Sequence, residues 1–148
     1  LVNNAGINRT NDFDLQTDEE WDEVLDVDLT GVFRCTQEVL PYLVDHGSII
    51  NIGSLYASVS PDSRFYDHIS LDPPFLKPPA YGASKAAVVN LTRYLATVWG
   101  GYGVRVNTLS PGGVLGSQDP EFRRKFNDRV PLGRMALNTD LVGPLLFL

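Results

Sequence analysis

The sequence predicts an α/β fold in which an open, doubly wound parallel sheet carries helices on both faces. Two observations lead to this prediction. Short apolar runs rich in β-branched residues alternate with long segments of helical periodicity, an alternation typical of right-handed βαβ units. Each apolar run is also followed by a turn rich in asparagine, glycine, serine or proline, and such turns are where an open parallel sheet binds its ligands.

Three strands are expected from local composition. The first ends at Val2, where the segment Asn-Asn-Ala-Gly over residues 3–6 breaks the apolar pattern. Because the chain opens in the middle of this strand and lacks an initiator methionine, we expect it to be a fragment. Residues 48–53 and 104–109 are the other two β-branched runs, and each ends at a glycine- or proline-containing turn.

A long helix is expected between the first two strands. Thr17 and Glu20 form a capping-box pattern, in which each side chain bonds the backbone amide of the other residue. The pattern predicts a helix over residues 18–45, with Gly47 supplying a left-handed cap at its end. Cys35 lies inside this helix and is expected to be a small buried apolar residue.

The remaining elements follow from proline positions and periodicity. Pro79 suits the first turn of a second long helix, which reaches residues 100–101. Residues 121–129 predict a short charged helix, and residues 140–148 predict the start of another. The connection over residues 55–79 shows no clear period, and a connection of that length is often functional.

Composition and charge exclude several classes of function. The 148 residues suffice for one domain with a hydrophobic core. A net charge of −6 disfavours nucleic acid and anionic membranes as partners, and no apolar run approaches the ~20 residues that cross a bilayer. A single cysteine forms no internal disulfide, so we expect a reducing, cytoplasmic compartment. The two histidines, His46 and His68, are too few to indicate a metal site.

Tyr81 and Lys85 carry the main chemical signal. They lie four residues apart in the predicted second helix, which puts both side chains on one face. A phenol titrates near ~10, and an adjacent positive charge lowers its pKa by roughly 1–3. The pair therefore predicts proton transfer to or from a hydroxyl or carbonyl oxygen. Alone, the pattern is weak, because an ordinary pair on a helix surface has the same spacing.

The residues around this pair strengthen the signal. Residues 3–6, Ser54 and residues 111–113 follow the three predicted strands, whose carboxyl ends share one edge of the sheet. We expect Ser54 to face the same crevice as Tyr81. A hydroxyl there can bond a substrate oxygen and stabilise charge that develops on it.

Together these motifs resemble the short-chain dehydrogenase/reductase family along nearly the whole chain. Residues 3–6 resemble the motif after that family's fourth strand, and residues 51–54 resemble the segment of its catalytic serine. Tyr81 and Lys85 match its Tyr-x-x-x-Lys motif, and residues 104–112 resemble its sixth strand and the turn that holds the nicotinamide. Each motif is modest alone, but four in this order are highly specific.

The resemblance implies a single, incomplete Rossmann-like domain over residues 1–148 that binds NAD or NADP and interconverts a secondary alcohol and a ketone. Tyr81 would be the general acid/base, Ser54 would polarise the carbonyl, and Lys85 would lower the pKa of Tyr81 and bond the ribose. A homodimer or homotetramer would pack through the helices over residues 18–45 and 81–99. The implied cofactor-binding residues are Asn4, Ala5, Gly6, Tyr81, Lys85, Pro111, Gly112, Gly113 and Val114.

Asp28 is a departure from the family pattern, which usually has an asparagine that helps a water connect the lysine to solvent. A carboxylate there would accept hydrogen bonds from Lys85 and would also offset the charge that lowers the pKa of Tyr81. We therefore count Asp28 among the catalytic residues and expect an altered pH optimum. The alternative, that Asp28 only caps a helix kink, stays open.

Other departures concern the cofactor and the substrate. Gly116 stands where the family often has a threonine, and the sequence contains no Gly-rich pyrophosphate turn. The connection over residues 55–79 is about twice the usual length for the family. This connection would either bind a polar, sugar- or polyol-like substrate or form a solvated or oligomer-facing loop. Its candidate substrate residues, with Ser54, are Tyr56, Arg64, Tyr66, Asp67 and His68.

Two rival functions remain from the sequence. One is a non-catalytic binding or assembly module that keeps the helices and has lost activity. A Gly-rich strand–turn–helix encoded upstream of Leu1 would favour the enzyme over this module. The other is a sugar-nucleotide epimerase or dehydratase, which shares Tyr-x-x-x-Lys but is disfavoured by the motif at residues 3–6.

Overall fold

A computed structural model describes residues 1–9, 13–69 and 77–148 of the chain. Three parallel strands form one sheet in the order β1–β2–β3. Their bounds are β1 (Val2–Asn3), β2 (Ser48–Ile52) and β3 (Arg105–Leu109). Ile50 at the centre of β2 pairs with Val2 on one side and with Asn107 on the other. The predicted α/β class, with its parallel sheet, is confirmed.

Buried amides hold the strands to each other and to a helix. The Asn3 side chain donates to Asn51 Oδ1 at 2.8 Å and to Thr36 Oγ1 at 3.2 Å. Asn51 in turn donates to Thr92 Oγ1 at 2.8 Å. Because every one of these side chains is buried, their hydrogen bonds fix the register of β1 and β2 against the helices.

The predicted helix over residues 18–45 is present, but it is not one regular α-helix. α1 (Asp18–Leu25) begins at the Thr17 capping box, as predicted. A π-helical turn (Asp26–Thr30) joins it to α2 (Gly31–Val39), and a 3₁₀ turn (Leu40–Tyr42) follows. π turns inside helices are frequent at functional sites. This one carries the fully buried Asp28.

Two expectations for this helix are wrong. The left-handed residue after it is Asp45, with φ 79°, and not Gly47. Gly47 is instead a point of close approach, where an added Cβ would collide with Leu43. Cys35 is exposed and not buried, because Thr36 and Val32 are the α2 residues that face the interior.

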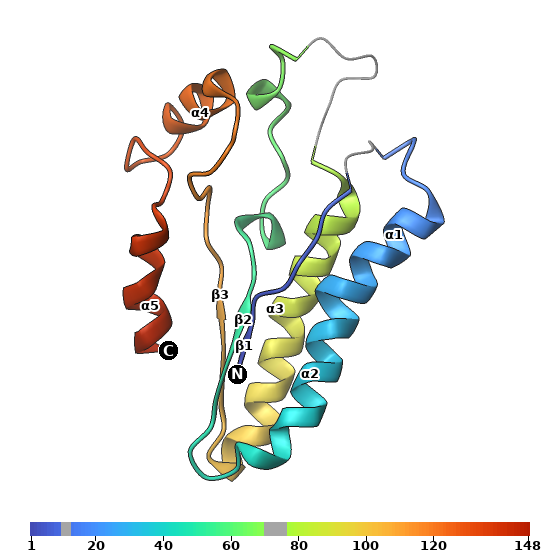
Figure 1. Cartoon of the computed structure of the whole chain (residues 1–148), viewed down its shortest axis with the longest axis vertical. Coiled ribbons are helices and arrows are strands. Elements are labelled where there is room, and N and C mark those ends of the chain that lie inside the picture. Colours follow the sequence, from blue (N-terminus) through green and yellow to red (C-terminus); the bar gives the residue numbers. More distant parts are fainter. Residues whose placement is uncertain (10–12, 70–76) are drawn as a thin grey trace.

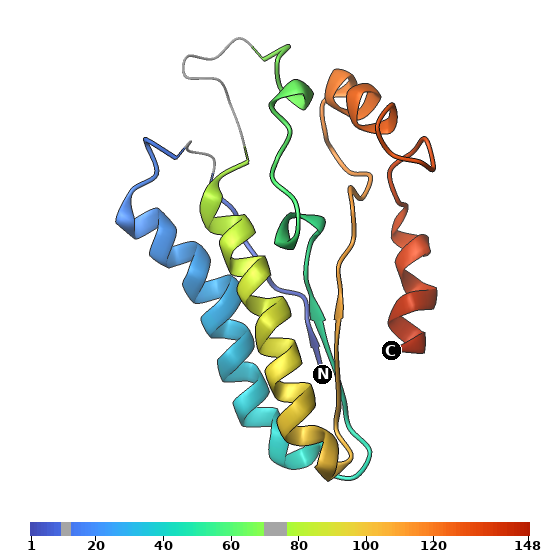
Figure 2. The ribbon, with the colours of Figure 1, turned by 180° about the vertical axis from the view of Figure 1, so that it is seen from behind.

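The helices lie on both sides of the strands. α3 (Pro79–Trp99) starts at Pro79, as predicted, and lies beside α1 and α2 on one side of the sheet (Figure 1). Figure 2 shows α5 (Val142–Phe147) on the opposite side, below α4 (Pro120–Asn127). A 3₁₀ turn (Asn138–Leu141) leads into α5. This two-sided arrangement is the one expected for a doubly wound sheet.

Two apolar clusters hold these layers together. The main core lies between the sheet and the long helices and contains Leu40, Ile49, Leu95, Val104 and Val106. The second cluster joins the segment after β2 to α4 and contains Phe65, Tyr66, Phe126 and Met135. The second cluster fixes one wall of the site described next. None of the described helices is long and apolar enough to cross a membrane.

Candidate active site

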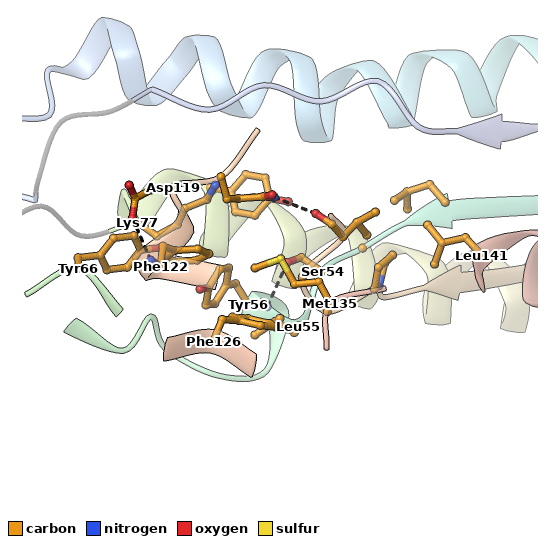
Figure 3. A pocket seen from close by; sticks show the side chains of 18 of the residues that line it. Ser54, Leu55, Tyr56, Tyr66, Lys77, Asp119, Phe122, Phe126, Met135 and Leu141 are labelled. Atoms are coloured by element: carbon orange, nitrogen blue, oxygen red, sulfur yellow. Dashed lines mark hydrogen bonds between the residues drawn. The ribbon is translucent and has the colours of Figure 1, made fainter. Parts of the chain in front are cut away.

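A cavity of about 590 Å³ opens at the carboxyl ends of the strands. Its volume lies within the usual range for small-molecule sites. Figure 3 shows its lining side chains, which come from β2 and its following turns, from the start of α3 and from the segment around α4. The wall includes nine of the residues singled out in the sequence: Asn4, Ser54, Tyr56, Tyr66, Tyr81, Pro111, Gly112, Gly113 and Val114.

Ser54 and Tyr81 meet in this cavity. Ser54 follows the end of β2, and Tyr81 lies in the first turn of α3, so two separate elements position the pair. A hydrogen bond with Ser54 lowers the pKa of the Tyr81 phenol, as expected when the serine hydroxyl donates. Ser54 Oγ also accepts the backbone N–H of Tyr56 at 3.2 Å, which orients the hydroxyl.

The pKa of Tyr81 nevertheless lies above its ordinary value, contrary to the sequence prediction. Burial is the largest cause, the hydrogen bond from Ser54 opposes it, and the negative charge of Asp28 raises it further. The predicted lowering by Lys85 is absent from this balance. Asp28, the carboxylate beside Lys85, instead contributes a negative charge that disfavours the phenolate.

Asp28 and Lys85 form a buried ion pair. Lys85 Nζ lies 3.8 Å from Asp28 Oδ2 and donates a hydrogen bond to the Ile52 carbonyl oxygen at 3.1 Å. The Asp28 carboxylate also accepts the backbone N–H of Ile7 at 2.7 Å and the Ser84 hydroxyl at 3.2 Å. Asp28 therefore pairs with the lysine and also ties the turn after β1 to the π-helical turn.

Lys85, Ala5 and Gly6 are not part of the cavity wall. Lys85 lies behind Tyr81, almost fully buried, with its nitrogen 5.6 Å from the centroid of the Tyr81 ring. A Cβ added to Gly6 would come within 3.3 Å of both Asp28 Oδ1 and Lys85 Nζ. Glycine at this position thus leaves the backbone free to approach the buried pair.

The turn after β3 is held firmly in place. The carbonyl oxygen of Gly113 accepts the N–H of Ala136 at 2.8 Å, and a Cβ on Gly113 would come 2.7 Å from the Phe126 ring. Gln118 donates to the Val114 carbonyl at 2.8 Å and accepts the N–H of Gly116 at 2.7 Å. Gln118 lines the cavity and was missed in the sequence, where nothing distinguishes it from other surface glutamines.

The segment after Ser54 divides into residues that line the cavity and residues that do not. Tyr56 and Tyr66 line it, and hydrogen-bond to each other; burial is the main cause that raises the pKa of each. Arg64 is mostly exposed and pairs with Asp62 at 2.7 Å. His68 lies outside the wall as well.

His68 and Asp67 connect this segment to α4. His68 Nε2 lies 2.8 Å from Asp119 Oδ1, and Asp67 forms an ion pair with Lys125. Asp119 also caps the start of α4. Among the described residues, no group of three or more histidine, cysteine, aspartate or glutamate side chains is arranged to hold a metal ion.

Lys77 is a second cavity residue that the sequence did not reveal. Its ammonium nitrogen lies 4.6 Å from the centroid of the Tyr81 ring, closer than that of Lys85. The available signal was a basic residue four positions before Tyr81. Lys77 precedes the first residue of α3, however, so helical spacing gave no reason to pair the two.

The fold and the site define a Rossmann-type α/β protein with a serine, a tyrosine and a lysine at the carboxyl ends of its strands. A family model described as short chain dehydrogenase matches residues 1–66, and one described as Enoyl-(Acyl carrier protein) reductase matches residues 73–148. The chain belongs to the short-chain dehydrogenase/reductase family.

Individual proteins agree with this assignment. A 2-dehydro-3-deoxy-D-gluconate 5-dehydrogenase of Dickeya dadantii is 34% identical over the whole of this chain and 56% of its own length. A short chain dehydrogenase of Leptospira borgpetersenii, crystallised with NAD+, is 37% identical with a TM-score of 0.89, over 99% of this chain and 56% of that one. A gluconate 5-dehydrogenase of Burkholderia cenocepacia, in complex with NADP and tartrate, is 31% identical with a TM-score of 0.84, over 99% and 55%. The chain thus spans about half the length of these relatives.

Proposed function

We propose that this protein is an NAD- or NADP-dependent oxidoreductase that interconverts a secondary alcohol and a ketone on a sugar- or polyol-like substrate. The observation that carries the proposal is that Ser54 and Tyr81 share the wall of one cavity, with the Lys85 nitrogen 5.6 Å from the centroid of the phenol ring. A hydroxyl and a phenol that converge on one point can bind a single substrate oxygen.

The residues around the cavity suit the nicotinamide half of a dinucleotide. Asn4 and residues 111–114 line it, and Gly6 offers open backbone against the buried pair. Lys85 uses one donor on Ile52, so its ammonium keeps donors for a ribose hydroxyl. When bound, NAD or NADP accepts or supplies the hydride. We propose that residues 1–148 are the catalytic part of a single domain of this kind.

Tyr81 acts as the general acid/base in this proposal. Because its pKa is raised, Tyr81 holds its proton at neutral pH and is ready to donate it to a ketone oxygen. Ser54 orients that oxygen and shares the charge that develops on it. Lys85 and Asp28 set the electrostatic balance behind the ring. The protonated phenol is the form that serves ketone reduction, and the phenolate is the form that serves alcohol oxidation.

The substrate class rests on the cavity and on the relatives. Two of the relatives described above act, by name, on gluconate or on a dehydro-deoxy-gluconate. Tyr56 and Tyr66 put hydroxyl groups on a wall that is otherwise largely apolar, which suits a small molecule with several hydroxyls. Arg64 and His68 remain candidates for substrate contact through the same segment.

We also propose a cytoplasmic homodimer or homotetramer packed through α1, α2 and α3. Large apolar side chains on these helices are exposed, among them Phe33 at 51% and Tyr94 at 64%. Exposed side chains of this kind are typical of a surface that another subunit covers. The single free cysteine, Cys35, supports a reducing compartment. The net charge of −6 supports a small molecule, and neither nucleic acid nor a membrane, as the partner.

A substrate screen on the full-length protein tests the proposal. Alcohols and ketones are supplied with NAD or NADP in either redox state, and reduced-nicotinamide absorbance is followed. Tyr81→Phe should lower turnover of any substrate by about 10²–10⁴-fold, because the proton donor is lost while the ring remains. Tyr94→Phe, an exposed tyrosine of the same helix, is the matched control. Undiminished turnover in Tyr81→Phe would refute the role of Tyr81, and no turnover of any substrate would favour the non-catalytic module.

A further inference from the structure

Lys77 is the basic side chain on the cavity wall, and the described lining contains no other. It lies directly before α3 and is partly buried. Its ammonium nitrogen is 4.6 Å from the centroid of the Tyr81 ring. Lys77 therefore puts a positive charge next to the group to which we assign proton transfer.

Other basic residues near the cavity have carboxylate partners. Lys85 lies 3.8 Å from Asp28, and Lys125 pairs with Asp67. Lys77 differs, since within residues 1–9, 13–69 and 77–148 it forms no ion pair. The difference marks Lys77 as the cation whose charge the described part of the protein leaves available.

Asp119, the acidic residue on the same wall, already has hydrogen-bond partners within the protein. Asp119 accepts the backbone N–H groups of Glu121 and Phe122 at the start of α4, at 2.8 and 3.0 Å. It also lies 2.8 Å from His68. Asp119 therefore caps a helix and holds His68, and it lies outside ion-pair distance of Lys77.

The surroundings of Lys77 favour the binding of an anion. Burial lowers the pKa of Lys77, and the more distant charge of Asp28 opposes this only in part. Apolar side chains form part of the nearby wall, Phe122 among them (Figure 3). An ammonium removed from water is unfavourable without a partner, whereas a charge-assisted hydrogen bond in an apolar cavity is strong.

We propose that Lys77 binds a carboxylate of the substrate, so that the substrate is a hydroxy acid or the matching keto acid and not a neutral polyol. This inference rests on the proposed oxidoreductase function and assigns a charge to its sugar-like substrate. Because the ammonium lies over the ring of Tyr81, the carboxylate would be a few bonds away from the carbon that reacts.

Matched acids and amides test the inference. The full-length protein is assayed with D-gluconate and tartrate, each beside its neutral amide, which has the same hydroxyl pattern and no charge. We expect kcat/KM to be higher for the acids. In Lys77→Gln the ratio of acid to amide should fall by about 10- to 100-fold, chiefly through KM, because one charge-assisted contact is lost. Lys77→Arg should keep most of the ratio.

Arg124→Gln is the matched control variant, because it removes an exposed positive charge of α4 without touching the cavity wall. A ratio that persists in Lys77→Gln, or that falls equally in Arg124→Gln, would overturn the inference. Equal losses for acid and amide in Lys77→Gln would also overturn it, since Lys77 would then act on Tyr81 and not on the substrate.

Binding separates this inference from the proposed function. Calorimetric titration of D-gluconate into the protein with NAD or NADP measures recognition without turnover. Turnover of neutral polyols without any preference for acids contradicts the role of Lys77 and leaves the oxidoreductase function intact. Gluconate binding that depends on Lys77 in a protein without turnover contradicts the function and supports the role of Lys77.

Discussion

Lys85 and Lys77 approach the ring of Tyr81 from different parts of the chain, and their surroundings are opposite. Lys85 projects from α3, is buried, and has Asp28 as its partner 3.8 Å away. Lys77 precedes α3, is partly buried, and pairs with none of the described carboxylates. Among the described residues, the nearer of the two cations is thus the one that forms no ion pair, with nitrogen-to-centroid distances of 4.6 Å for Lys77 and 5.6 Å for Lys85.

The difference in pairing suggests different roles for the two lysines, one in the stability of the protein and one in substrate recognition. A charge that is paired inside the protein adds little net field at the cavity, and its loss leaves a buried partner without compensation. A charge that is unpaired at a cavity wall costs little to remove from the fold and acts mainly on what binds. We therefore expect the Lys85 side of the ring to govern stability and proton transfer, and the Lys77 side to govern the choice of substrate.

Lys85→Met should have the largest effect. It leaves the carboxylate of Asp28 buried without its cation, which costs about 3–5 kcal/mol in the free energy of unfolding. Turnover should also fall sharply. Lys77→Met should change the free energy of unfolding by less than about 1 kcal/mol. Chemical denaturation of both variants measures the difference.

The double variant Lys85→Met/Asp28→Asn is the control for this prediction. Removing the stranded charge should restore part of the lost stability, because the two residues are in direct contact and their effects do not add. Equal destabilisation by Lys85→Met and Lys77→Met would contradict the distinction between the two lysines.

Ser54→Ala should have the next largest effect. The hydroxyl that orients the substrate oxygen is lost, and removal of one such donor typically lowers turnover by about 10²–10³-fold. The hydrogen bond from Ser54 lowers the pKa of Tyr81, so its loss should raise that pKa and move the alkaline limb of ketone reduction to higher pH. Reduction rates against pH measure both effects; an unmoved limb would contradict the hydrogen bond.

The sequence predicted the fold well, because its signals are local. The Thr17 capping box, Pro79 and the β-branched runs each specify an element through neighbouring residues, and each prediction is confirmed. The prediction for Gly47 was wrong because the sequence does not distinguish a glycine required by a left-handed φ from one required by close packing. The prediction that Cys35 is buried was wrong because helical periodicity does not determine which residues at the edge of the apolar face stay exposed.

The site was predictable only in part. Motif spacing was enough to predict that Tyr81 and Ser54 face one cavity. The sign of the pKa change at Tyr81 was not predictable, because it depends on burial and on how close Asp28 lies to Lys85 in space. The same holds for Lys77 and Gln118, which reach the wall through tertiary contacts and carry no local pattern.

Asp28→Asn should have the smallest effect on turnover near neutral pH, and its main effect should be a shift of the pH profile. Asparagine has nearly the same shape, and its oxygen can still accept the N–H of Ile7, so the π-helical turn should persist. Asp28 raises the pKa of Tyr81, and removing its charge should lower that pKa. The phenol would then lose its proton at lower pH, so the alkaline limb of ketone reduction should move to lower pH, opposite to the shift in Ser54→Ala. Profiles of reduction rate against pH for the two variants and the parent protein, recorded at the same salt concentration, measure the direction in which the alkaline limb moves. A profile that stays in place would show that Asp28 serves the helical turn alone, and that its pairing with Lys85 has no effect on Tyr81.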